Sequence, residues 1–119
     1  IRAVFLLGFP VKYGGTMKVT QTRTIEKRVV DIYEKSIAKE SDAEKETAQR
    51  LIDQIRYAFR LIDIFDDSNH LQIVEKLYFC KENILKLNLH RMADKVFVQE
   101  RTLFFYRQKY CKVFKEILS

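Results

Sequence analysis

Glycine and proline are almost missing from this sequence of 119 residues. It has three glycines, one proline and no tryptophan, and residues 16–119 contain neither glycine nor proline. A stretch of that length is difficult to fold into β-hairpins, because their tight turns favour Gly and Asn. The absence argues against a β-rich fold. It predicts an all-α protein whose helices are joined by short polar connections.

Cysteine is scarce as well, and this limits both disulfides and metal sites. Cys80 and Cys111 lie beside aromatic residues and are too few for a disulfide framework, so we expect free thiols in a reducing cytoplasm. Together with His70 and His90 they have spacings that match no zinc-ligand pattern. We therefore expect a cytoplasmic protein without a zinc site.

Catalytic signatures are also missing. The sequence has no legible Ser-His-Asp or Cys-His arrangement and no glycine-rich phosphate loop. Asp63, Asp66 and Asp67 precede His70, which is more typical of a helix end followed by the first turn of the next helix than of a metal site. We expect a protein that is not an enzyme and that uses no metal or other cofactor.

Residues 1–16 differ in composition from the rest of the chain. The apolar run IRAVFLLGFPV is too short to span a bilayer, and Met17 follows shortly after a Gly-Gly pair. We expect residues 1–16 to be a tag-like or linker segment, with a native edge strand or a partner-binding arm as the alternative. No membrane association is expected.

Positive charge is concentrated in the last third of the chain. Residues 80–119 carry nine basic and four acidic side chains, a net charge of +5 out of the total of +6. A local basic excess is what a polyanion-binding surface needs, since contacts to phosphates release condensed counterions. An ordinary solvated surface is the alternative.

Apolar residues at three- and four-residue spacing predict helices across the remaining chain. Residues 17–79 form a predicted helical scaffold, which could also serve for dimerisation, and residues 80–119 form a predicted DNA-binding region. Ser41 opens a capping-box pattern, Ser68 or Asn69 is the expected cap of the third helix, and Asn88 that of the fourth. The expected helices are residues 20–39, 41–66, 70–79, 89–96 and 99–118.

Residues 88–114 have the pattern of a helix-turn-helix. Two helices that cross steeply over a short turn need a small residue at their closest approach and apolar residues at fixed offsets. Ala93 occupies the small position. The apolar positions are filled by Met92, Val96, Val98, Leu103 and Tyr106.

The run MADKVFVQERTLFFYR, residues 92–107, resembles the promoter-reading region of sigma factors and, more closely, phage transcriptional regulators of the ArpU/RinA kind. The resemblance extends over about residues 70–118 and implies a DNA-binding regulator. The sequence departs from that pattern at two positions. Phe97 replaces the usual turn Gly and would need a positive φ, and Gln99 replaces the usual Ser or Thr cap.

The last predicted helix has an outward face without carboxylates. This face combines side chains that suit the major groove, where Arg binds guanine, Gln binds adenine and apolar groups contact thymine methyls. Burial of Phe104 or Phe105 against other helices or a second subunit is the alternative. The expected base contacts are Gln99, Arg101, Phe104, Phe105 and Gln108, and the expected phosphate contacts are Arg91, Lys95, Arg107, Lys109 and Lys112.

The sequence thus predicts a sequence-specific protein that binds double-stranded DNA, a transcriptional regulator that could act as a homodimer. Three alternatives stay open. The chain could be a sigma-like factor that also binds RNA polymerase, or a phage packaging or recombination component with the same motif. It could also be a helical protein-interaction module whose basic aromatic face binds an acidic partner.

Overall fold

The computed structural model describes residues 17–119, so the tag-like or linker segment expected at residues 1–16 lies outside the described residues. The described part is all-helical and contains no strand, which confirms the predicted fold class. No helix in this part is long and apolar enough to cross a membrane. The elements are α2 (Val19–Ser36), α3 (Ala43–Asp66), α4 (His70–Leu77), the short 3-10 helix η1 (Ile84–Lys86), α5 (Leu89–Val96) and α6 (Glu100–Leu118).

Side-chain caps fix where the helices begin. Asn88 accepts a hydrogen bond from the backbone N–H of Arg91 (2.9 Å), which confirms the predicted cap of α5. At the start of α3, Asp42 rather than Ser41 accepts from the backbone N–H of Lys45 (2.8 Å). These bonds satisfy amide groups that have no partner within the helix.

The cap of α4 comes from the preceding helix. The sequence predicted Ser68 or Asn69 as this cap, but neither side chain caps the helix. Instead, Asp63 near the end of α3 accepts from the backbone N–H groups of His70 (2.7 Å) and Leu71 (2.9 Å). This carboxylate therefore holds the corner between the two helices.

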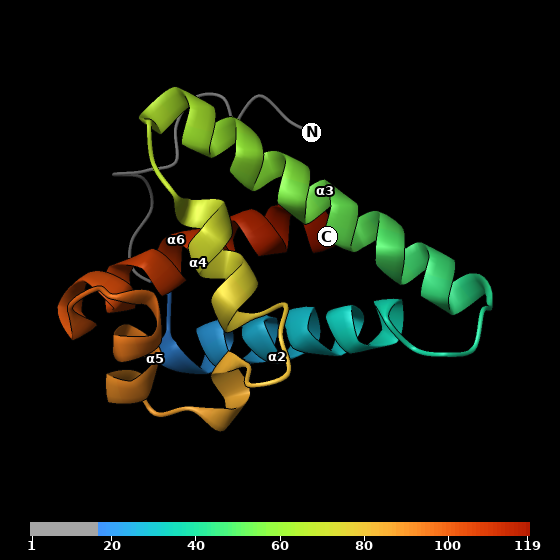
Figure 1. The fold of residues 1–119 in the computed structure, drawn as a ribbon, viewed down its shortest axis with the longest axis horizontal. Coiled ribbons are helices and arrows are strands. Elements are labelled where there is room, and N and C mark those ends of the chain that lie inside the picture. Colours follow the sequence, from blue (N-terminus) through green and yellow to red (C-terminus); the bar gives the residue numbers. More distant parts are fainter. Residues whose placement is uncertain (1–16) are drawn as a thin grey trace.

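The three long helices contact one another. In Figure 1, α6 runs between α3 and α2, with α5 near the N-terminal end of α6. The shorter α4 packs against both α3 and α5. Helix α6 is therefore flanked by scaffold helices over much of its length, and this limits how much of its surface faces solvent.

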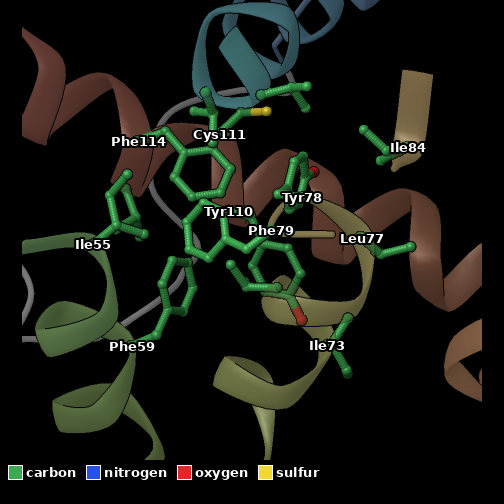
Figure 2. Packing of buried hydrophobic residues seen from close by; sticks show 14 of the residues in the cluster. Ile55, Phe59, Ile73, Leu77, Tyr78, Phe79, Ile84, Tyr110, Cys111 and Phe114 are labelled. Atoms are coloured by element: carbon green, nitrogen blue, oxygen red, sulfur yellow. The ribbon is translucent and has the colours of Figure 1, made fainter. Parts of the chain in front are cut away.

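A cluster of aromatic rings joins the scaffold to α6 (Figure 2). Phe59 of α3 meets Tyr110 and Phe114 of α6 edge-on, with ring centroids 5.3 and 5.8 Å apart. Tyr78 contacts Phe114 in the same manner at 5.0 Å. The hydrophobic core runs from Val29 to Leu118, so residues 17–79 and residues 80–119 pack on one common core.

Candidate nucleic-acid interface

Helices α5 and α6 are joined by a connection of three residues, 97–99. Phe97 ends α5 in the left-handed region (φ 59°, ψ 43°), which confirms the positive φ predicted for this position. The backbone N–H groups of Phe97 and Val98 bond back to Asp94 O (3.3 Å) and Ala93 O (3.1 Å). Across this short turn α5 and α6 pack against each other, as the helices of a helix-turn-helix do.

The apolar positions of the predicted motif lie in the core or pack against it. Ala93 is 4% exposed, so a side chain larger than a methyl group would meet its neighbours. Met92, Val96 and Leu103 are buried, and Val98 and Tyr106 are partly buried against the same cluster. The spacing that suggested the motif therefore corresponds to one packed face.

The solvent-facing side of α6 is a narrow stripe. At about 100° per residue, Arg101, Phe105 and Lys112 fall within one sector of the helix, and all three are exposed. Gln108 falls in the same sector but is buried, so the stripe is interrupted between Phe105 and Lys112. Phe105 is 46% exposed, and Phe104 is half-buried with its ring edge-on to Phe105 at 5.6 Å. This stripe combines positive charge with an accessible aromatic ring.

The other predicted DNA-contacting residues differ in exposure. Arg91 on α5 and Gln99 in the turn are exposed, and Gln99 makes no capping bond with its side chain. Lys109 is half-buried next to the stripe. Lys95 is half-buried too, and its Nζ donates to Glu82 O (2.6 Å) and Cys80 Sγ (3.3 Å). Its ammonium thus tethers the segment before α5.

Gln108 is not exposed to solvent, which corrects the prediction from the periodicity of α6. It is 6% exposed. The backbone N–H of Met17 donates to Gln108 Oε1 (2.8 Å), and Gln108 Nε2 lies 3.5 Å from Thr22 Oγ1. The start of α2 covers this flank of α6, and a pattern read from α6 alone cannot reveal that second partner.

Arg107 is also misplaced by the prediction, because it forms a buried ion pair rather than facing phosphates. Its guanidinium donates to both carboxylate oxygens of Glu26 in α2, at 2.6 and 2.8 Å. Tyr78 donates to the same carboxylate (2.6 Å), and the side chain of Glu26 is fully buried. The group joins three parts of the fold through one acidic side chain.

The pKa values in this group follow from burial and from Glu26. Burial opposes the charged form of Arg107, but the hydrogen bonds and charge of Glu26 outweigh it and raise the pKa of the guanidinium. Burial, followed by the nearby Glu26 carboxylate, raises the pKa of Tyr78 well above its usual value. Arg107 therefore remains charged and Tyr78 remains a neutral hydrogen-bond donor.

The junction of α5 and α6 carries two acids that the motif pattern did not reveal. His90 lies between them, with Nε2 3.3 Å from Asp94 Oδ2 and Nδ1 3.2 Å from Glu100 Oε2. All three side chains are exposed. The four-residue spacing of His90 and Asp94 on a helix was the available signal for the first contact.

His70 contributes to packing. It is 8% exposed, its Nδ1 lies 2.7 Å from the Tyr110 hydroxyl, and its ring is edge-on to Tyr106. Burial lowers the pKa of this imidazole. Among residues 17–119, no group of three or more His, Cys, Asp or Glu side chains is arranged to hold a metal ion.

Comparisons of this chain with protein-family models, with curated proteins and with solved structures found no match.

Proposed function

We propose that this chain is a sequence-specific DNA-binding protein that regulates transcription, in the manner of the phage regulators it resembles. The observation that carries the proposal is the exposed stripe of Arg101, Phe105 and Lys112 on α6. This helix follows a three-residue turn and an apolar face typical of a helix-turn-helix. A face of this kind suits the first half of a recognition helix in the major groove.

Each exposed side chain has a role in this proposal. Arg101 lies in the first turn of α6, where a guanidinium can bind guanine O6 and N7. Gln99, just before the helix, can bind adenine, and the ring of Phe105 can contact a thymine methyl. Lys112 lies further along α6 and Arg91 lies on α5, and both are assigned to phosphates.

The ion pair with Glu26 reduces the charge available for DNA, because Glu26 lies outside residues 80–119 and neutralises Arg107. Non-specific attraction should therefore be weaker than the net charge of residues 80–119 suggests. We expect sequence readout, rather than bulk charge, to supply a large share of the affinity for the preferred site.

Two substitutions separate base readout from phosphate contact. Arg101→Ala should weaken binding to a selected duplex by roughly 1–3 kcal/mol and change binding to a scrambled duplex much less. Lys112→Ala should weaken both about equally and reduce the slope of log affinity against log salt by about one. Arg50→Ala, at an exposed position of α3, is the matched control and should change neither.

The measurement is a salt titration of fluorescence anisotropy on both duplexes. Equal losses for Arg101→Ala on the two duplexes would mean that Arg101 reads no sequence. If the parent binds neither duplex, the DNA proposal fails. The exposed rings of Phe97 (86%), which lies under Lys76, and of Phe105, one turn after Arg101, would then favour a module that binds an acidic protein surface.

A further inference from the structure

The outer side of α3 exposes large apolar side chains near its C-terminal end. Ile64 is 71% exposed, Phe65 is 65% exposed and Tyr57 is 50% exposed. Leu61 between them is partly buried. Clustered exposure of this kind on a helical surface marks an interaction site more often than an ordinary solvated face.

The patch points away from the rest of the molecule. At about 100° per residue, Tyr57, Leu61 and Ile64 share one sector of α3, whereas the buried Phe59 and Ile62 lie on the opposite side. Helix α3 packs against α2, α4 and α6 and lies along one edge of the fold in Figure 1. Its outer face is therefore accessible to a partner.

Opposite charges lie on either side of this patch, so they would meet if two copies of α3 packed antiparallel. Arg60 lies one turn before Ile64, and Asp67, the left-handed residue that ends α3, lies about one turn after it. Both side chains are exposed. In an antiparallel pair, Arg60 of one copy would face Asp67 of the other, twice.

We propose that the chain forms a two-fold dimer through antiparallel α3 helices, with the axis near Ile64. Such an interface must be self-complementary, and an apolar centre with opposite charges at similar distances on either side meets that condition. Phe65 on the other flank would pack against Leu61 of the second copy. The inference goes beyond DNA binding, because none of these residues belongs to the DNA-binding stripe on α6.

One helix face is a small contact area, so the dimer should be in reversible equilibrium with the monomer. Sedimentation velocity of the full chain without DNA, over about a hundredfold range of concentration, should show this equilibrium. Ile64→Asp should give a monomer throughout that range. Because Ile64 is exposed, the Ile64→Asp variant should stay folded and helical, as thermal melting followed by circular dichroism would show. A monomeric parent, or an Ile64→Asp variant that still dimerises, would overturn the proposal.

A charge exchange tests the antiparallel arrangement. Arg60→Asp and Asp67→Lys should each weaken dimerisation by about tenfold or more, because each places two like-charge contacts in the interface. The double variant restores opposite charges and should recover most of the affinity. Arg50→Asp, on the N-terminal half of the same helix, is the control and should dimerise like the parent. A double variant that is as weak as the two single variants would refute the proposed pairing.

Discussion

Replacement of Arg107 by alanine distinguishes the structural role of this residue from the DNA contact that the sequence suggested. Glu26 is fully buried and accepts two of its three side-chain hydrogen bonds from Arg107. The substitution leaves the carboxylate with the Tyr78 hydroxyl and with Arg23, whose Nη1 lies 3.8 Å away and is not hydrogen-bonded to it. A buried charge that loses its partner is strongly destabilising.

The magnitude follows from that uncompensated charge. Removal of one partner of a buried pair costs about 3–5 kcal/mol, out of a total stability of roughly 5–15 kcal/mol for a domain. For a folded unit of this size each kcal/mol lowers Tm by about 4–8 °C, so we expect Arg107→Ala to melt at least about 12 °C below the parent. The double variant Glu26→Gln/Arg107→Met removes both charges and should recover part of the loss.

Thermal melts and urea titrations followed by circular dichroism measure both effects. Arg101→Ala, at an exposed position of the same helix, is the matched control and should stay within about 0.5 kcal/mol of the parent. If Arg107→Ala unfolds like Arg101→Ala, the ion pair does not stabilise the fold. Arg107 would then again be a candidate for a phosphate contact.

Two further predictions concern the turn and His70. Phe97→Gly should raise the unfolding free energy by about 1 kcal/mol, because Gly adopts the left-handed conformation of this residue (φ 59°) without the steric cost of a Cβ atom. Phe97 is 86% exposed, so little packing is lost. A lower urea midpoint would contradict this. Burial, only partly opposed by the charge of Asp63, lowers the pKa of His70 below 6.5, so the unfolded chain binds this proton first as the pH falls. The unfolding free energy contributed by His70 should be present above about pH 6.5 and lost as the pH falls through the pKa of the folded state. In urea titrations at several pH values, His70→Gln should flatten this pH dependence. An unchanged pH dependence would show that other groups cause it.

Local signals predicted most of the fold. Asn88 caps α5 as expected, and the left-handed conformation of Phe97 was predicted from its place at the turn position usually held by Gly. Such features depend on residues within one turn of each other, which a single sequence displays directly. The end of α3 and the start of α4 were also placed well, although the cap comes from Asp63, several residues earlier.

Long-range packing explains where the site prediction was wrong. The periodicity of α6 identified the side that meets the core, but α2 covers a second flank and buries Gln108 and Arg107. The partner of Arg107 is 81 residues away in the sequence. One signal was present, since Glu26 lies on the same stripe of α2 as the buried Thr22 and Val29. A charged residue on an apolar stripe requires a partner, but the stripe does not say which one.

The most direct test of the central proposal is selection of duplexes from a random DNA library by the purified full chain, followed by titration of the enriched and scrambled sequences at one physiological salt concentration. Sequence-specific DNA binding predicts a reproducible motif that is bound at least about a thousandfold more tightly than its scrambled form. Enrichment of no motif, or equal affinity for the enriched and scrambled duplexes, would contradict the account.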